Sequence, residues 1–246
     1  MTKRLNSNHL KFIAIAAMTV DHIADLLFPN FSAHPAAIVM HIIGRITAPI
    51  MWFFICEGFH YTHNFKRYLG RMAIFAVISH FAYCFAFGIN FLPFSDGDVL
   101  NQTSVIFALC GGLCALWVMH GKNELKAWQK YALLILTDLV TFPADWSCIA
   151  VMAILSMYEK RGSPEKQTRD MLIWVTIYAA VIFFAMNKTQ GLIQLGVILI
   201  YPFIKAYNGE RGKAKHTKWL FYIYYPAHLA IIGILRITMY GNVPIL

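Results

Sequence analysis

Long runs of apolar residues alternate along the whole chain with shorter polar segments. About 20 apolar residues in a row allow a helix to cross the hydrocarbon core of a membrane, where only helices and closed barrels satisfy all of their backbone hydrogen bonds. The pattern predicts about nine transmembrane helices, with a range of eight to ten. They cover residues 10–28, 36–60, 70–88, 104–120, 130–142, 145–158, 171–186, 191–207 and 219–239. The fifth and sixth are short, so we expect them to be tilted or partly re-entrant.

No repeat, low-complexity run or linker separates these helices, which predicts a single domain, residues 1–246. The expected fold class is all-α, a polytopic integral membrane helical bundle. Composition agrees, because 59% of the residues are hydrophobic and 13% are charged, against about 25% charged residues in soluble domains. Residues 10–28 do not resemble a signal peptide, since they contain two acids and lead into further helices without a small-residue cleavage site.

The positive charges fall in alternate segments between the predicted helices. Most of the 21 Lys and Arg residues lie in segments that share one side of the membrane: Lys3, Arg4 and Lys11; Lys66, Arg67 and Arg71; Lys122, Lys126 and Lys130; Lys160, Arg161, Lys166 and Arg169; Lys205, Arg211, Lys213, Lys215 and Lys218. Loops rich in Lys and Arg stay in the cytoplasm. We therefore expect a cytoplasmic N-terminus, an extracytoplasmic C-terminus and a multi-pass protein of the bacterial cytoplasmic (inner) membrane. The lipid bilayer is then a partner, and the net charge of +9 requires no nucleic acid to explain it.

All five cysteines fall within predicted helices and do not suggest a disulfide framework. Cys110 and Cys114 share a helix face beside Gly111 and Gly112. Small residues on a membrane helix allow close approach of a neighbouring helix, so we interpret this stretch as a packing surface.

Ionisable side chains interrupt several apolar runs at similar depth, as estimated from a rise of about 1.5 Å per residue. Those of the first and second helices lie slightly outward of the membrane midplane, and those of the third, fifth and ninth lie near the middle. These residues are Asp21, His22, Arg45, His80, Asp138 and His228. Charges within a membrane usually face a bundle interior or a wet cavity, pair with one another and mark function. We therefore expect one buried polar layer shared by distant helices.

Within the first helix, Asp25 is three residues from His22 and can reach its ring. The adjacent Asp21 points about 100° away, toward a different partner such as Arg45. A carboxylate at one imidazole nitrogen fixes the tautomer and leaves the other nitrogen free as a base. The sequence thus allows Asp25 to orient His22, while an ion pair of Arg45 with either acid would also serve as a purely structural clasp.

Other ionisable residues have simpler interpretations. His80 or His228, taken alone, is more often a packing residue than a functional one. His41 lies near a helix end and is expected at the membrane interface. Glu57 lies too far toward the cytoplasm to reach the polar layer unless a bend at Pro49 brings it closer.

The chain resembles the TraX family in three segments: AAMTVDHIADLLFP, IGRITAPIMWFFICEGFHYTHNFKRYLGRMAIFAVISHFAYCFAFG and YNGERGKAKHTKWLFYIYYPAHLAIIGILR. The resemblance runs from about residue 10 to residue 236. The Asp-His pair, the Gly-Arg followed by Pro, the Tyr-Asn-Gly loop and the Tyr-Pro-x-His helix keep their order. Each is a weak motif alone, and the combination is fairly specific.

The best-known member of this family acetylates the N-terminus of a conjugative pilin subunit. The family also looks related to larger groups of membrane acyltransferases that use cytoplasmic acetyl-CoA. The resemblance therefore implies an acetyltransferase with acetyl-CoA as co-substrate and an unknown extracytoplasmic amine or hydroxyl as acceptor, such as a pilin N-terminus or a cell-surface component. It carries over to Asp21, His22, Arg45, Tyr225, Pro226 and His228.

Two positions depart from the pattern of the family. Relatives often have Glu or Gln where this chain has His80, so His80 is not expected to be essential. The stretch ADWSCIA keeps the acid Asp145 but lacks the Tyr-Gly of many relatives. The acceptor pocket is therefore expected to differ.

On this interpretation, His22 removes a proton from the acceptor or accepts the acetyl group itself, with Asp25 or Asp21 orienting its ring. Arg45 or His228 would stabilise the oxyanion. The CoA phosphates would bind basic groups of the cytoplasmic face. Ordinary positively charged loops explain most of these residues better, and the favoured pair is Arg67 and Arg71, which are four residues apart and could act together. The expected nucleotide-binding residues are Lys66, Arg67, Arg71, Tyr207, Asn208 and Arg211, and no metal ligand is expected.

Two other functions are compatible with the sequence. One is a proton-coupled transporter or permease, whose path would be lined by Asp21, Asp25, Arg45 and Asp138. The other is a b-type haem protein with histidines of the polar layer as axial ligands. Uptake into proteoliposomes without consumption of CoA would favour the first, and a haem absorption band would favour the second.

Overall fold

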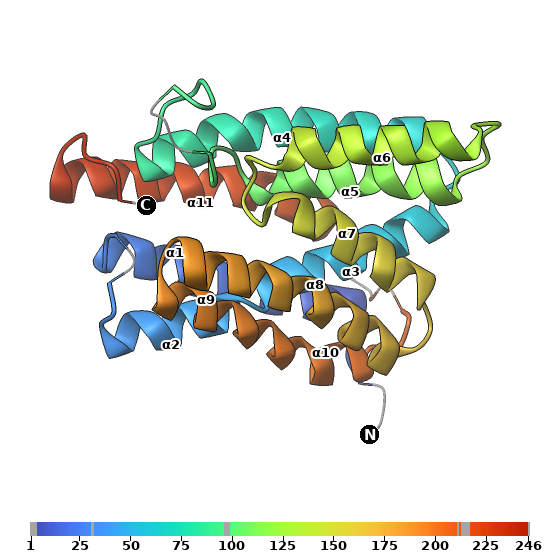
Figure 1. Ribbon diagram of the computed structural model, residues 1–246. Helices are drawn as coiled ribbons and strands as arrows, with labels where there is room; N and C mark the ends of the chain where they lie inside the picture. Colours follow the sequence, from blue (N-terminus) through green and yellow to red (C-terminus); the bar gives the residue numbers. More distant parts are fainter. Residues whose placement is uncertain (1–3, 31, 96–98, 211, 213–216, 246) are drawn as a thin grey trace.

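The computed structural model describes residues 4–30, 32–95, 99–210, 212 and 217–245, with no strand among them. Figure 1 shows the helices as two groups. The helices are α1 Ser7–Leu27, α2 Pro35–Gly44, α3 Thr47–Tyr61, α4 Phe65–Phe87, α5 Val105–His120, α6 Ala127–Thr141, α7 Ser147–Glu159, α8 Pro164–Ala185, α9 Lys188–Gln194, the 3-10 helix η1 Leu195–Ile200, α10 Tyr201–Lys205 and α11 Thr217–Tyr240. The predicted all-α fold is confirmed for these residues.

Local signals in the sequence account for several helix ends. The side chains of Asn6, Asn64 and Asn187 accept hydrogen bonds from backbone N–H groups in the first turns of α1, α4 and α9, as capping residues do. Pro35 opens α2, where its fixed φ suits the first helical turn. Gly88 ends α4 with φ +76°, a left-handed conformation that favours glycine.

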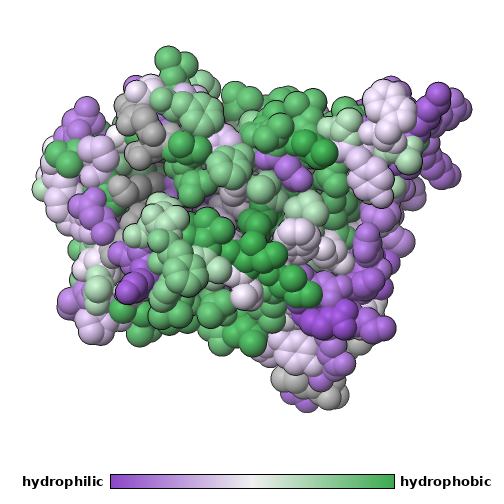
Figure 2. Space-filling model, in the orientation of Figure 1, coloured by the Kyte–Doolittle hydropathy of each residue, from purple (hydrophilic) through white to green (hydrophobic). Residues whose placement is uncertain are grey.

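Contacts between loops define two ends of the bundle. At one end, the backbone of Leu5 bonds that of Ala206 at 3.0 Å, and Arg161 pairs with Glu57 at 2.7 Å. At the other, the backbone of Ile245 bonds both Asn30 and Phe87 at 3.1 Å. We call these the basic end and the far end. Figure 2 shows hydrophilic side chains gathered at the right of the molecule, the side on which Figure 1 marks the N-terminus, beside a broad hydrophobic band.

Among the residues that the structure describes, three helical stretches are long and apolar enough to cross a membrane: Pro35–Tyr61, Phe65–Phe87 and Pro164–Ala185. Shorter apolar helices are Val105–His120 and Ser147–Glu159. Large apolar side chains also point outward from the bundle, as Phe184 does with 84% exposure. These surfaces suit a hydrocarbon surrounding, because in water an exposed apolar patch of this extent is rare.

Two predicted helices are interrupted. The stretch predicted as 36–60 divides into α2 and α3, with Arg45 and Ile46 between them. The break precedes Pro49, which lies in the first turn of α3, where a missing N–H removes no helical hydrogen bond. The stretch predicted as 191–207 consists of α9, η1 and α10 in succession.

The short helices α6 and α7 bring a turn into the interior of the bundle. The loop between α4 and α5 meets this turn, since Gln102 N donates to Pro143 O and Asp145 N to Thr103 O, both at 2.8 Å. Trp146 and Ser147 have φ values of 64° and 50°, a conformation that costs energy in residues other than glycine. The turn thus places Asp145 and Trp146 in the interior of the fold, beside the central cavity.

The stretch around Cys110 is a packing surface, as predicted. A Cβ on Gly111 would overlap the Thr141 side chain, and one on Gly112 would overlap that of Ile154. All five cysteines are free.

Candidate functional site

The centre of the bundle contains an ion pair between α1 and the α2–α3 break. Arg45 Nη2 donates to both carboxylate oxygens of Asp21, at 3.0 and 2.8 Å, and Nη1 donates to Gln194 Oε1 at 3.1 Å. Arg45 also lies over the ring of Trp146, 5.6 Å from its centroid. The pairing of Asp21 with Arg45 that the sequence suggested is therefore present, and it is largely buried, with side-chain exposures of 15% and 17%.

Gly44 explains why the Gly-Arg motif needs a glycine. A Cβ at this position would overlap the side chain of Asp21. The close approach of α1 and α2 therefore depends on the missing side chain, and the next residue can then extend its guanidinium along Asp21.

Gly44→Ala is expected to lower the free energy of unfolding by about 1–3 kcal/mol, the usual cost of overpacking, because it pushes Asp21 away from Arg45. Thermal unfolding in detergent measures this change. Gly70→Ala is the matched control, since nothing lies within 4 Å of a Cβ there. Equal unfolding temperatures for the two variants would contradict this explanation of the motif.

Two histidines from distant helices bond each other beside the ion pair. His22 Nδ1 lies 2.7 Å from His228 Nε2, with ring planes 1° apart. His228 Nδ1 lies 3.0 Å from the carbonyl oxygen of Tyr224. A carbonyl only accepts, so Nδ1 of His228 carries a hydrogen. In the neutral ring its Nε2 is then an acceptor and takes the Nδ1 hydrogen of His22.

This chain of bonds leaves Nε2 of His22 as an unprotonated nitrogen with no hydrogen-bond partner among the described residues. The Tyr224 carbonyl of α11 thus fixes the tautomer of His228, and His228 in turn fixes that of His22. The expected partner of His22 was Asp25, and that expectation is corrected: Nδ1 of His22 bonds His228 instead.

Asp25 points to His41, which sequence reasoning placed at the membrane interface. His41 is 5% exposed. Its Nδ1 lies 2.8 Å from Asp21 Oδ1 and its Nε2 lies 3.8 Å from Asp25 Oδ1. The histidine is in the interior because the helix that follows the far-end loop begins at Pro35, so that His41 is already two turns along it and faces α1.

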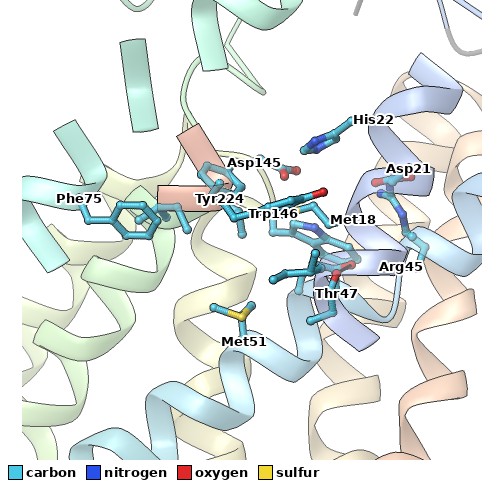
Figure 3. A pocket seen from close by; sticks show the side chains of 17 residues that line it. Met18, Asp21, His22, Arg45, Thr47, Met51, Phe75, Asp145, Trp146 and Tyr224 are labelled. Carbon is cyan, nitrogen blue, oxygen red and sulfur yellow. Dashed lines mark hydrogen bonds and ion pairs between the residues drawn. The ribbon is translucent and has the colours of Figure 1, made fainter. Parts of the chain in front are cut away.

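Two cavities meet at these residues. The central cavity, about 730 Å³, is mostly apolar and is lined toward the basic end by Met51, Phe75 and Ile106. Figure 3 shows it with Asp21, His22, Arg45 and Asp145 at one end and Met51 at the other. The far cavity, about 790 Å³, is lined by polar groups, among them Ser32 and Asn101 of the far-end loops and Thr189 of α9. The residues shared by both cavities are Asp21, His22, Arg45 and Asp145.

A third cavity opens at the basic end, and we call it the basic-end cavity. It shares Met51, Phe75 and Ile106 with the central cavity. Its other lining groups include charged and phenolic side chains: Lys11, Glu57, Tyr61, Tyr68, Arg71, Tyr207 and Tyr222. The three cavities therefore follow one another from the basic end through the polar centre to the far end.

Other predicted members of the polar layer lie elsewhere. His80 bonds the Thr103 hydroxyl at 2.9 Å and the Phe91 carbonyl at 2.8 Å, which makes it a loop-holding residue. Asp138 on α6 lines neither cavity that Asp21 lines. Glu57 pairs with Arg161 at the basic end, far from the polar layer as expected.

Two of the six predicted nucleotide-binding residues line the basic-end cavity. Arg71 and Tyr207 line the basic-end cavity, and the buried Nε of Arg71 has no hydrogen-bond partner among the described residues. Lys66 and Arg67 are exposed on the first turn of α4 and do not line it. Asn208 bonds Glu210 at 3.0 Å and the backbone of Leu5 at 2.9 Å. Arg211 lies outside the described residues.

Several site residues were not found from the sequence. Gln194, Trp146, Tyr224 and Lys11 each line one of the three cavities. Of the four, only Lys11 had a recognisable signal, a positive charge at the second residue of the predicted run 10–28. The predicted Tyr225 lines the central cavity beside Tyr224, and Pro226 lies within α11, where it cannot donate a helical hydrogen bond.

Comparisons with known proteins agree with the resemblance seen in the sequence. A family profile described as "TraX protein" matches residues 6–236. A relative from Dichelobacter nodosus, described as "Probable fimbrial assembly protein FimC, serogroup H1", is 29% identical over 229 residues, which cover 91% of this chain and 92% of the relative. No solved structure is detectably similar.

Proposed function

This chain belongs to the TraX family, and from that membership and the geometry of the site we propose that it is a membrane acetyltransferase. It takes acetyl-CoA at the basic end and transfers the acetyl group to an amine or hydroxyl presented at the far end. The observation that carries the proposal is the succession of three cavities, of which the central and the far one share His22 and the central and the basic-end one share Met51, Phe75 and Ile106. Donor and acceptor can then reach the same imidazole from opposite sides.

The proposed setting is the bacterial cytoplasmic membrane, crossed several times. The basic end faces the cytoplasm, because loops rich in Lys and Arg are retained there. Acetyl-CoA is made in that compartment. The far end then faces outward, which matches an acceptor exported from the cell.

The chemistry proposed for His22 follows from its free nitrogen. As the acceptor nitrogen or oxygen attacks the thioester carbonyl, Nε2 takes its proton, the carbon–sulfur bond breaks, and the proton passes to the thiolate of CoA. His228 holds the ring by accepting its Nδ1 hydrogen. Arg45 stabilises the negative charge that forms on the carbonyl oxygen. His228, the alternative suggested by the sequence, has no free N–H for this role, because its Nδ1 hydrogen is donated to the Tyr224 carbonyl. An acetyl-His22 intermediate uses the same groups in two steps.

The donor would bind along the basic-end and central cavities. Lys11 and Arg71 supply positive charge for phosphate groups, and the apolar central cavity suits the pantetheine arm. The described residues offer no cluster of ligands suited to a metal ion.

The acceptor proposed is a pilus or fimbrial subunit. The Dichelobacter nodosus relative is described as a fimbrial assembly protein, and the open far cavity faces the side on which such subunits assemble. Because the far cavity contains several acids and one arginine, it favours a cationic group such as an ammonium.

The test uses purified protein in lipid nanodiscs with radiolabelled acetyl-CoA and an envelope fraction from cells that lack this protein. We expect label in envelope proteins and stoichiometric free CoA. Release of CoA without labelled acceptor, or no release at all, would contradict the proposal.

Arg71→Ala is expected to raise KM for acetyl-CoA about tenfold or more with a smaller change in kcat, since a charge-assisted hydrogen bond contributes about 1.5–3 kcal/mol. Arg67→Ala is the matched control on the same helix, because that side chain is exposed outside the cavity. Steady-state kinetics at varied acetyl-CoA measures both. An equal rise in KM for the two variants would mean that the overall positive charge of the basic end, and not a specific contact of Arg71, sets the affinity for acetyl-CoA.

One observation also fits a transporter, namely the succession of cavities between the two ends. Uptake of a solute into proteoliposomes without consumption of CoA would favour that function. A b-type haem site is disfavoured by geometry, because the hydrogen bond between His22 and His228 leaves no room for an iron between the two nitrogens.

A further inference from the structure

His41 is held between two carboxylates one turn apart on α1. One of them, Asp21, is already neutralised by Arg45. The other, Asp25, is 8% exposed and approaches His41 Nε2 at 3.8 Å. This separation is beyond a hydrogen bond and within the range of an ion pair. Nε2 of His41 is buried without a hydrogen-bond partner among the described residues. This nitrogen and the nearby Asp25 carboxylate could therefore bind one proton between them.

The position of this pair differs from that of His22. His41 and Asp25 line the far cavity and do not line the central one, whereas Asp21 and His22 line both. The pair is therefore on the acceptor side of the junction between the cavities. Since His41 also bonds Asp21, it connects the far cavity with the ion pair at the centre.

A protonated amine acceptor would have to lose two protons, and this step rests on the function proposed above. One proton leaves before attack, because an ammonium nitrogen has no lone pair. The second leaves as the carbon–nitrogen bond forms and ends on the sulfur of CoA. The products are the amide, CoA thiol and one proton. His22 accounts for the proton that reaches sulfur, and a second group is needed for the proton that is released.

We propose that Asp25 and His41 are the groups that take this first proton from the acceptor ammonium and return it to water at the far end. Asp25 accepts the proton from the ammonium nitrogen, and His41 Nε2 shares it. No oxidant, reductant or further substrate is required. His41 acts here through Asp25 and is a positioning residue. Asp25 faces the acceptor.

Other titratable and charged groups lie around Asp25 and His41 in the far cavity. On the same helix are Asp21 and His22. Arg45 approaches from the α2–α3 break, Asp145 from the turn before α7, and the phenols of Tyr83 and Tyr178 from α4 and α8. Asp145 is the alternative proton acceptor, so its variant belongs in the same experiment.

The experiment measures the pH profile of acetyl transfer to the envelope fraction for wild type, Asp25→Asn, His41→Gln and Asp145→Asn. An α-amino group has a pKa of about 8. We therefore expect Asp25→Asn and His41→Gln to be slower by about tenfold or more at pH 6 and to approach the wild-type rate above about pH 9, where the amine is already neutral. Asp138→Asn, an acid of α6 outside the cavities, is the control with an unchanged profile. A loss that is the same at every pH, or an acid-side loss confined to Asp145→Asn, would overturn the proposal.

A second measurement needs no acceptor. In protein labelled with 15N-histidine, the His41 resonances are identified by their absence in His41→Gln. Asp25→Asn is expected to shift them, and Asp138→Asn is not. Unshifted His41 resonances in Asp25→Asn would overturn the pairing even if acetyl transfer occurs, whereas absence of transfer with a shifted His41 would reject the acetyltransferase and keep the pair.

Discussion

Replacing His22 with alanine is expected to reduce acetyl transfer by about 10²–10⁴-fold, the contribution of a general base. The reason is the tautomer set by the Tyr224 carbonyl through His228, which leaves Nε2 of His22 unprotonated at the junction of two cavities. The measurement is transfer of labelled acetyl groups to the envelope fraction, together with release of free CoA. Binding of acetyl-CoA is expected to change little, because Arg71 and the basic-end cavity are distant from the imidazole.

His34→Ala is the control for this variant, since His34 is an exposed residue at the start of α2. Rates like that of wild type in His22→Ala, with the protein folded, would reject His22 as the base. A pre-steady-state burst of CoA in the absence of acceptor would favour the acetyl-His22 intermediate over direct transfer.

Arg45→Gln is expected to lower the free energy of unfolding by about 3–5 kcal/mol and to abolish transfer. The substitution leaves Asp21 buried without its opposite charge, which is the costly way to break a buried ion pair. The hydrogen bonds to both oxygens of Asp21 and to Gln194 are lost together. Chemical denaturation followed by tryptophan fluorescence measures the stability.

The double variant Asp21→Asn/Arg45→Gln separates stability from activity. Because both charges are then absent, a substantial part of the stability is expected to return, while transfer stays lost if Arg45 stabilises the oxyanion. A double variant as unstable as Arg45→Gln alone would show that desolvation of an unpaired charge is not the cause. Recovery of both transfer and stability would instead show that the ion pair of Asp21 and Arg45 has a purely structural role, the alternative that the sequence also allowed.

Hydrophobic periodicity predicted the helices and the depth of charged residues predicted the centre of the site. Asp21, Arg45, His22 and His228 come from three distant parts of the chain, and they meet because each interrupts an apolar run at a similar distance from its ends. Depth along a helix axis is readable from residue counting. The rotation of a helix about its axis, which decides which neighbour each side chain faces, is not readable in this way. For this reason the sequence suggested His22 as the partner of Asp25, whereas in the structure Asp25 faces His41.

The break at Arg45 could not be predicted because the visible signal, Pro49, lies beyond it. The break lies next to the close contact of Gly44 with Asp21, which depends on packing between helices and leaves no local mark except a glycine. For the same reason the sequence could not choose between Arg67 and Arg71 for the basic-end cavity. Both are basic residues on one helix, and only the position of α3 and α11 decides which of them is covered.

The inward turn between α6 and α7 has a consequence for a membrane under voltage. Asp145 lines both the far cavity and the central cavity, so the spaces that lead toward the two ends are separated at the centre by the layer of side chains that both cavities share. In the proposed orientation most of the electrical potential would fall across that layer. A charge crossing all of it gains or loses about 2.3 kcal/mol per 100 mV, so proton movement at the centre of this protein would be driven or opposed by the energised state of the cell.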